Sequence, residues 1–253
     1  MNTESDFEVD LELFRQDELI DEVLGELKPG KEATVFLVRK GDEVLALKHY
    51  RPMLGRHFAN SAKYREGRFM KARDARAFTR RSRYGRVVAQ GSWIAAEFGM
   101  AHRLYRAGVP VPRPIAMHGA SILMQFIPDT PGSLETPALR LSDYRPTPDE
   151  ARLIHARVMQ AIITMMTRNV VHADLSAFNI LVPADEAGRR ANPVIIDFPQ
   201  AVDPRSNRAS RELLAHDIDA VTIYCRRFNP EITDHNLLQK LWHDFTEGRL
   251  TSQ

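Results

Sequence analysis

Three polar side chains flank two short apolar runs in the second half of the chain, and their types suit one kind of chemistry. Asp174 and Asn179 lie in one loop, and Asp197 ends the apolar run 194–196. A carboxylate can orient or deprotonate an attacking hydroxyl, and carboxylate and carboxamide oxygens are ligands that Mg²⁺ prefers. Transfer of a γ-phosphoryl group depends mainly on positioning and metal ions. The spacing therefore predicts a phosphoryl-transfer site.

A second group of charged residues lies near the start of the chain. Lys48 ends an apolar run that follows the turn-forming residues Lys40–Asp42, where an ammonium can meet nucleotide phosphates. Lys31 follows Gly30 in an earlier turn and offers a second positive charge. Most lysines are surface residues without such a role, so this assignment depends on the other motifs.

These residues require an α+β arrangement to position them. Apolar spacing predicts helices that end near Pro or Gly, and β-branched runs separated by turn residues predict strands. We expect helices over Leu11–Leu24, Ser92–Ala107 and Asp149–Thr167, a hairpin of Thr34–Val38 and Glu43–Leu47, and strands over Ile115–Met117 and Ile122–Phe126. The Pro-, Thr- and Ser-rich connector 128–148 is the expected boundary between two lobes.

Composition indicates an ordinary globular protein. The chain has 253 residues, of which 43% are hydrophobic and 27% charged. Its single cysteine excludes an internal disulfide, which is typical of a reducing compartment. The acidic N-terminus does not resemble a signal peptide, and no segment is apolar enough to span a membrane. We therefore expect a cytoplasmic protein without a membrane partner.

The small net charge of +2 hides a separation of sign. Residues 4–26 carry ten acids and one arginine, whereas the basic arm, residues 51–86, carries twelve Lys and Arg against two acids. Five aromatic residues are interleaved with those cations, a mixture that suits phosphate neutralisation and base stacking. Two interpretations remain open: contact with RNA or a ribosomal particle, or a solvated loop that folds back on the acidic body.

Together these motifs resemble the RIO family of atypical protein kinases and ATPases, most closely its bacterial members. Residues 30–36 read GKEATVF where the family has a GKEANVY type of phosphate loop. Residues 172–179 read HADLSAFN against the family's HGDLSEYN, and 196–202 read IDFPQAV against IDxxQAV. Trp93 and Glu97 occupy the positions of the family's Trp-Ala-x-x-Glu helix. The resemblance covers roughly residues 25–228.

The resemblance implies a two-lobed protein-kinase-like fold with a small N-lobe, built on an antiparallel sheet, and a mainly helical C-lobe. Charge, predicted helices and the connector after Pro128 divide the chain into an acidic helical extension over 1–27, an N-lobe with the basic arm over 28–127 and a C-lobe over 128–253. ATP and Mg²⁺ would be the cofactors. The residues implied are Asp174 and Asp197 for catalysis, Asn179 and Asp197 for the metal, and Lys31, Lys48, Glu97, Met124, Phe126 and Ile127 for the nucleotide.

The implied activity is that of a serine/threonine kinase or ATPase, with autophosphorylation of Ser61, Thr79 or Ser82 as a further expectation. Asp197 could itself accept the phosphoryl group, because a carboxylate nucleophile divides hydrolysis into two steps. The short stretch between Asp203 and the helical segment that begins near Ala209 leaves no room for a long activation segment with a peptide-docking portion, which weakens the case for a protein substrate. The alternatives are a small-molecule phosphotransferase of the aminoglycoside or choline kinase kind, or a silent RNA-binding assembly module.

Two other polar residues of the loop are expected to support its structure. Ser176 is interpreted as a capping hydroxyl and not as a nucleophile. His172 is interpreted as a donor to the loop backbone and not as a base. The family has glycine at Ala173, an acid at Ala177 and a small residue at Pro199, but these differences remove no group with a proposed chemical role.

Overall fold

The computed structural model describes residues 3–30, 32–51 and 83–250. Lys31, most of the basic arm and its three candidate hydroxyls lie outside these ranges. The chain divides into two compact units. Among the described residues, unit 1 comprises 3–30, 32–51, 83–102 and 113–126, and unit 2 comprises 103–112 and 127–250.

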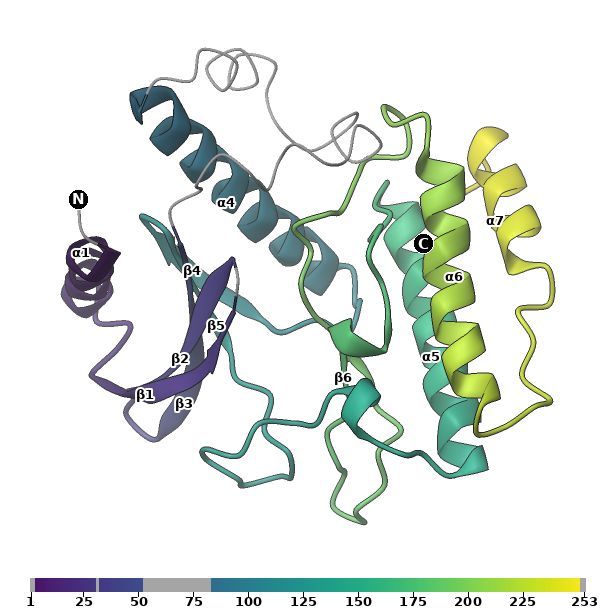
Figure 1. Ribbon diagram of the computed structural model, residues 1–253, viewed down its shortest axis with the longest axis horizontal. Helices are drawn as coiled ribbons and strands as arrows, with labels where there is room; N and C mark the ends of the chain where they lie inside the picture. The colour runs from purple at the N-terminus through teal and green to yellow at the C-terminus, as the bar shows by residue number, and fades with distance from the viewer. Residues whose placement is uncertain (1–2, 31, 52–82, 251–253) are drawn as a thin grey trace. The chain divides into compact units, whose positions relative to one another are not determined.

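Unit 1 is built on one antiparallel sheet with strand order β1-β2-β3-β5-β4 (Figure 1). The strands are β1 (Glu22–Pro29), β2 (Ala33–Lys40), β3 (Glu43–Tyr50), β4 (Pro114–His118) and β5 (Ser121–Gln125). The predicted hairpin and the predicted second pair of strands are confirmed, and Gly41 turns the chain between β2 and β3 with a φ of 54°. A glycine suits this position because positive φ strains residues with a Cβ.

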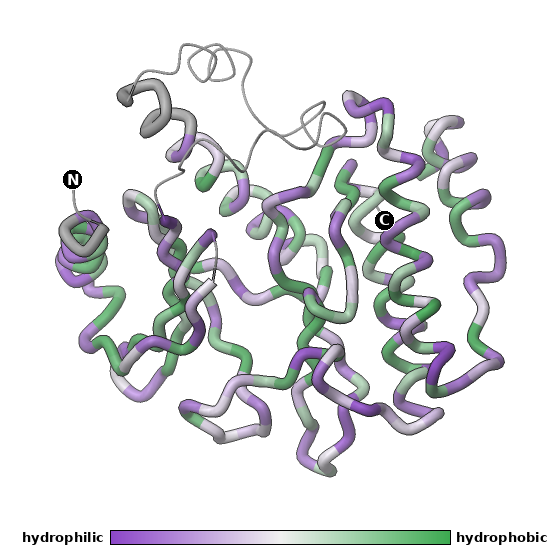
Figure 2. Tube along the Cα trace, viewed as in Figure 1, coloured by the Kyte–Doolittle hydropathy of each residue, from purple (hydrophilic) through white to green (hydrophobic). Residues whose placement is uncertain are grey.

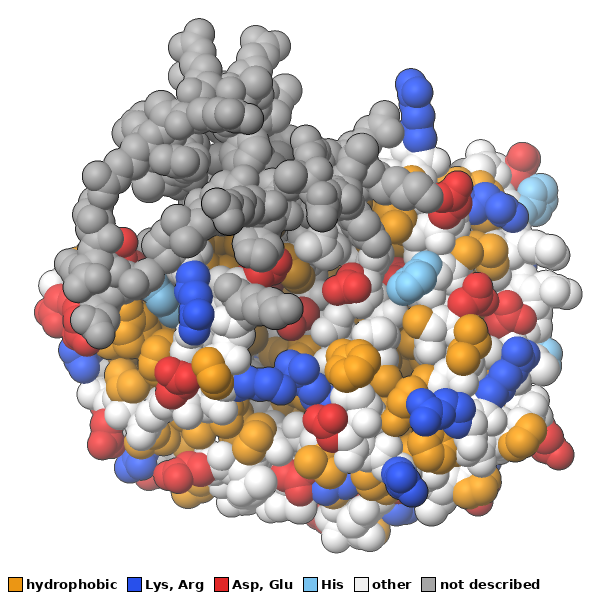
Figure 3. All heavy atoms as spheres, viewed as in Figure 1, with side chains coloured by type: hydrophobic (Ala, Val, Ile, Leu, Met, Phe, Trp, Pro, Cys, Tyr) orange, Lys and Arg blue, Asp and Glu red, His pale blue; other side chains and the backbone are white. Residues whose placement is uncertain are grey.

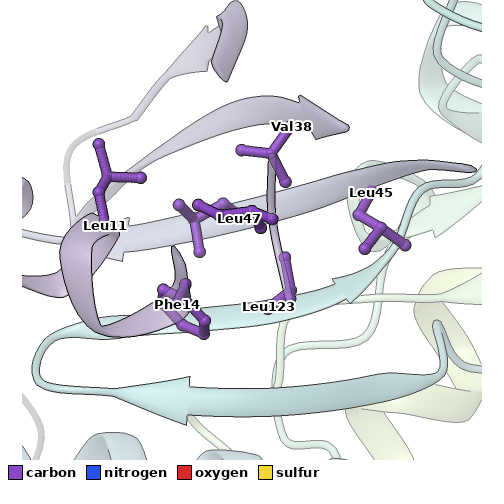
Figure 4. Close-up of a cluster of buried hydrophobic side chains, with 7 residues drawn as sticks. Leu11, Phe14, Val38, Leu45, Leu47 and Leu123 are labelled. Atoms are coloured by element: carbon purple, nitrogen blue, oxygen red, sulfur yellow. The ribbon is translucent and has the colours of Figure 1, made fainter. Parts of the chain in front are cut away.

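Helices cover the two faces of this sheet, as the alternation of side chains along β3 requires. Leu45 and Leu47 pack with residues of α1 (Thr3–Gln16), whereas Tyr50 packs with residues of α4 (Arg83–Arg106). Figure 4 shows the α1 side, where Leu11 and Phe14 point toward the strands. The seven buried residues of this cluster are Leu11, Phe14, Ile20, Val38, Leu45, Leu47 and Leu123.

The first predicted helix was wrong in its extent. The helix begins at Thr3 and ends at Gln16, and residues 22–24 belong to strand β1 instead. Glu18 adopts a φ of 56°, and the Asp21 carboxylate accepts hydrogen bonds from the Gly41 N–H at 2.7 Å and the Lys40 ammonium at 2.9 Å. Pairing with β2 overrides the loosely helical apolar spacing, because strand pairing satisfies the backbone of residues 22–29.

Unit 2 is mainly helical. Its helices α5 (Pro148–Thr167), α6 (Ser210–Arg226) and α7 (Leu237–Thr246) pack against one another. Both α5 and α6 alternate between hydrophobic and hydrophilic residues along their length, as helices with one buried face do (Figure 2). The predicted start of α5 is confirmed by a capping box, in which Thr147 and Glu150 satisfy each other's backbone N–H groups.

Unit 2 also contains two short paired strands, β6 (Ile180–Leu181) and β7 (Val194–Ile195), and 3₁₀ turns over Leu141–Asp143 and Ala177–Asn179. On the face shown in Figure 3, acidic and basic side chains are interspersed with hydrophobic ones. Within the described ranges, no helix combines the length and the apolar character needed to cross a membrane.

The division of the chain into the domains 1–27, 28–127 and 128–253 stays a prediction. The chain passes from unit 1 to unit 2 after Phe126, and residues 103–112 also belong to unit 2.

Candidate active site

In unit 1 the predicted partners Lys48 and Glu97 meet. The Lys48 ammonium lies 3.1 Å from Glu97 Oε1, and the two side chains are only 13% and 9% exposed. Lys48 is held on the central strand β3, opposite Val35 of β2 and Ile122 of β5, and Glu97 comes from α4. An ion pair removed from water in this way has a fixed geometry, which suits a group that must meet phosphate oxygens.

Tyr50 packs beside the Lys48–Glu97 pair, and the sequence analysis did not identify this residue. Its ring lies 5.0 Å from the Lys48 ammonium and packs edge-on against Trp93 with centroids 5.0 Å apart. Burial, together with the nearby Glu97 carboxylate, raises the pKa of Tyr50 well above its usual range. Among the described residues, the Tyr50 hydroxyl and Glu97 Oε2 have no hydrogen-bond partner. The apolar alternation of β3 could have indicated that Tyr50 shares a face with Lys48.

The residues predicted to contact adenine lie around the end of β5. Met124 is partly buried, and Phe126 is 6% exposed in a cluster with Leu37 and Ala46. The Phe126 ring is therefore a core group of unit 1. The carbonyl of Ile127 in unit 2 accepts a hydrogen bond from the Ala138 N–H at 2.9 Å. The nucleotide-binding role of these residues stays a prediction.

In unit 2 the loop that carries Asp174 is held by hydrogen bonds to Asp217 of α6. The Asp217 carboxylate is 1% exposed and accepts hydrogen bonds from the N–H groups of Ala173 at 2.8 Å and Leu175 at 2.9 Å. Burial raises its pKa to about 7, while these two N–H groups act in the opposite direction. Sequence reasoning missed Asp217, although its spacing from Leu213 and Leu214 places it on the buried face of α6.

His172 joins the Asp174 loop to the Asp197 loop. It is fully buried, its Nε2 lies 3.2 Å from the Ile196 carbonyl, and its Nδ1 lies 3.3 Å from the Asp174 N–H. A carbonyl only accepts and an N–H only donates, so we assign a neutral ring with the proton on Nε2. Burial lowers the pKa of His172 to about 4, consistent with the neutral form. The ring therefore has the expected structural role, but it accepts from the backbone of its own loop and donates to the backbone beside Asp197.

The other loop residues are fixed by short-range hydrogen bonds. Ser176 caps the 3₁₀ turn Ala177–Asn179 by accepting a hydrogen bond from the Phe178 N–H at 3.4 Å, as expected of a capping hydroxyl. The Asn179 Nδ2 donates to the Asp174 carbonyl at 2.8 Å. With the amide nitrogen used in this way, the Asn179 Oδ1 is the atom left to act as a ligand.

Asp197 lies beside Asn179 because strands β6 and β7 pair. Ile180 is opposite Ile195, and the next N–H, that of Ile196, donates to the Asn179 carbonyl at 3.0 Å. Asp197 then adopts a φ of 66°, which turns the chain sharply at the end of the strand. Such left-handed conformations are uncommon outside glycine and cluster at functional sites.

These unit 2 groups fit a magnesium ion. One carboxylate and one carboxamide oxygen, supplemented by water and phosphate oxygens, form the type of coordination that Mg²⁺ commonly uses. The described residues contain no group of three or more His, Cys, Asp and Glu side chains that could hold a metal without such help. Asp174 is exposed at the surface, yet the atoms packed around its carboxyl partly desolvate it and raise its pKa.

The burial of His172 predicts that the free energy of unfolding depends on pH. Its pKa is about 4 in the folded protein and about 6.5 in an unfolded chain, so only the unfolded chain gains a proton as pH falls through this window. The contribution of His172 to stability is therefore complete above pH 6.5 and falls by about 3 kcal/mol on the way to pH 4. Urea unfolding of the wild type and of His172→Gln at several pH values measures it.

The difference between the two unfolding free energies is the informative quantity. The raised pKa of Asp217 acts with the opposite sign in nearly the same window, because the folded protein binds that proton first as pH falls. Subtracting the variant from the wild type removes this contribution from Asp217. A difference that stays constant from pH 7.5 to pH 4.5 would contradict the prediction.

Comparison with known proteins identifies the family. A family model described as the RIO domain matches residues 34–238. The RIO-type serine/threonine-protein kinase Rio1 of Haloferax volcanii is 31% identical over 213 residues, which cover 84% of this chain and 66% of that protein. The serine/threonine-protein kinase RIO3 of Caenorhabditis elegans is 29% identical over 231 residues, covering 89% and 41%. The chain thus spans less than two thirds of the length of either relative.

A solved structure shows the same fold. The crystal structure of a Rio2 kinase from Chaetomium thermophilum, described as an ADP/Mg²⁺-phosphoaspartate complex, has a TM-score of 0.64 at 20% identity and covers 97% of this chain and 77% of its own. The predicted two-lobed protein-kinase-like fold, with an antiparallel sheet in one unit and helices in the other, is confirmed. By its family match over residues 34–238, the chain belongs to the RIO domain family.

Proposed function

We propose that this chain is an ATP- and Mg²⁺-dependent RIO-type serine/threonine kinase or ATPase. The observation that carries the proposal is the pairing of β6 with β7, which sets Asn179 and Asp197 side by side next to the pinned loop of Asp174. A chain that serves only as an assembly module has no physical need for these three groups together with a buried Lys48–Glu97 pair.

Each group has a role in this proposal. Asn179 and Asp197 would hold Mg²⁺, which neutralises the charge that develops on the transferred phosphoryl group. Asp174 orients the attacking hydroxyl or water and accepts its proton. Lys48, fixed by Glu97, binds phosphate oxygens of ATP, and Lys31 adds positive charge in the preceding turn. Met124, Phe126 and Ile127 border the adenine.

The named relatives support the proposal. The proteins from Haloferax volcanii and Caenorhabditis elegans are described as serine/threonine-protein kinases, and the Rio2 structure contains ADP and Mg²⁺. The phosphoaspartate of that complex accords with a second role for Asp197 as a phosphoryl acceptor. The single cysteine supports a reducing compartment, and we propose the cytoplasm as the location.

The proposed partner of the basic arm is RNA or a ribosomal particle. The support is the charge of residues 51–86, in which twelve Lys and Arg residues face two acids, and the aromatic residues among them. Gel mobility of an RNA oligomer with the full chain at increasing salt tests this partner, since phosphate contacts weaken steeply with salt.

Asp197→Asn provides the decisive test of the enzymatic proposal. Loss of one carboxylate ligand is expected to lower ATP turnover at 1 mM Mg²⁺ by about 10²-fold or more, because charge stabilisation by the metal contributes several kcal/mol. Release of ADP is measured at a series of Mg²⁺ concentrations for both proteins. The matched control is Asp219→Asn, which changes an exposed carboxylate on α6. Equal turnover in the wild type and Asp197→Asn would refute the assignment.

A further inference from the structure

A buried polar cluster joins helix α1 to the sheet of unit 1, on the side away from Tyr50. Asp10 is 5% exposed, His49 6% and Ser121 0%. The Asp10 Oδ2 accepts hydrogen bonds from the Ala120 N–H at 3.0 Å and the Ser121 hydroxyl at 2.8 Å, and it lies 3.5 Å from His49 Nδ1. One carboxylate of α1 thus contacts both β3 and the turn that leads into β5.

The direction of each hydrogen bond follows from the number of protons. Ser121 has one hydroxyl proton, and it is donated to Asp10. The contact of 2.8 Å between His49 Nδ1 and the Ser121 hydroxyl therefore requires a proton on Nδ1. The cluster is a chain of donors that ends on Asp10, and removal of this carboxylate would leave buried donors without an acceptor.

This cluster adjoins Lys48 through the backbone. His49 follows Lys48 on β3 and points to the α1 face, and it pairs with Ser121 while Lys48 pairs with Ile122. Asp10 therefore holds together the His49–Ser121 pair, which directly follows the Lys48–Ile122 pair along the two strands. Phe7 of α1 packs edge-on against the His49 ring, with centroids 5.0 Å apart, and adds a second contact at this position.

Gly119 shows how closely Asp10 approaches the turn between β4 and β5. Gly119 has a φ of 50°, and a Cβ at this position would lie 1.9 Å from Asp10 Oδ1. Such an approach is possible only for glycine, so Gly119→Ala would displace the carboxylate without changing it. Gly41 has a similar φ of 54° with no atom within 4 Å of the added Cβ, and it provides a control for backbone strain.

We propose that Asp10 is a positioning residue for Lys48, acting through His49 and Ser121. The proposal rests on the proposed role of Lys48 in nucleotide binding. Helix α1 precedes residues 34–238, the part of the chain that the RIO domain model matches. Asp10 would therefore couple an element outside this match to the lysine that is proposed to bind phosphate. When Asp10 is lost, the end of β3 loosens and the Lys48–Glu97 pair holds less firmly.

The test compares five full-length proteins: the wild type, Asp10→Ala, Asp10→Asn, Gly119→Ala and Gly41→Ala. The first readout needs no nucleotide: acetic anhydride acylates lysines, and mass spectrometry gives the rate at Lys48 relative to the exposed Lys240. The second readout is KM and kcat for ATP. Circular dichroism confirms that each protein is folded at the assay temperature.

We expect Lys48 to react about 3- to 10-fold faster in Asp10→Ala and Gly119→Ala, as neighbours in one network are coupled to this extent. KM for ATP rises by a similar factor while kcat changes less. Asp10→Asn lies between, because its amide oxygen still accepts one hydrogen bond. Gly41→Ala matches the wild type.

Unchanged Lys48 acylation in folded Asp10→Ala and Gly119→Ala would overturn the inference. If Asp10→Ala does not fold, Gly119→Ala and Asp10→Asn decide the question by the same criterion. Faster acylation in a protein whose wild type neither binds nor hydrolyses ATP would support the positioning role and refute the proposed function instead.

Discussion

Replacement of Asp174 by Asn is expected to lower the rate of phosphoryl transfer from ATP by about 10²- to 10⁴-fold, the range that a positioned general base contributes. Asparagine has nearly the same size but does not accept the proton of the attacking hydroxyl. The loop should keep its shape, because its hydrogen bonds to Asp217 and the shorter hydrogen bond from Asn179, at 2.8 Å, use backbone groups, and only the Asn179 contact of 3.5 Å involves the Asp174 carboxylate. ADP release under single-turnover conditions measures the effect on the chemical step.

The affinity for nucleotide distinguishes a chemical role from a binding role. Asp174 is assigned neither to phosphate nor to adenine, so binding of a non-hydrolysable ATP analogue with Mg²⁺ should stay within about threefold of the wild type. Asp219→Asn should match the wild type in both assays. An Asp174→Asn protein that turns over ATP at the normal rate would show that this carboxylate is not the base.

The second large effect is expected from Asp217→Ala. This change leaves the buried N–H groups of Ala173 and Leu175 without an acceptor and removes two hydrogen bonds to a carboxyl group. The free energy of unfolding should fall by about 3 kcal/mol, since each unsatisfied buried group costs about 1–3 kcal/mol. Turnover of ATP should fall as well, because the loop that orients Asp174 loses its support.

Asp219→Ala is the matched control, because it makes the same chemical change two residues away on α6 at an exposed position. Its effect on stability should stay within about 0.5 kcal/mol. Urea unfolding followed by circular dichroism gives both values. Equal stability of Asp217→Ala and Asp219→Ala would show that the two hydrogen bonds do not support the loop.

Several elements could be predicted from the sequence because their signals are local. The hairpin of β2 and β3 follows from two apolar runs around Gly41, and the start of α5 follows from Thr147, Pro148 and Glu150. Ser176 and His172 were also interpreted correctly as supporting groups, since short loops offer such side chains nearby backbone partners. These features depend on residues close together in the chain.

Other features required contacts between distant residues. Val23 and Leu24 continue the helical spacing of Leu19 and Ile20, yet residues 22–24 form a strand because β2 offers them a partner. The sequence also gave no indication that Asp10 would meet Ser121, since 111 positions separate them. Each outcome depends on burial against another element, and the local sequence does not encode it directly.

The sequence by itself determined the candidate chemistry: the types and order of Lys48, Glu97, Asp174, Asn179 and Asp197 indicate phosphoryl transfer with Mg²⁺ and ATP. Only the tertiary structure decided how these groups are held. Asp217 anchors the Asp174 loop, the Ile196 N–H joins the segment of Asp197 to Asn179, the other candidate metal ligand, and α1 holds the strand positions beside Lys48. The physical reason is that side-chain type sets what a group can do, whereas buried hydrogen bonds between distant segments fix where it lies.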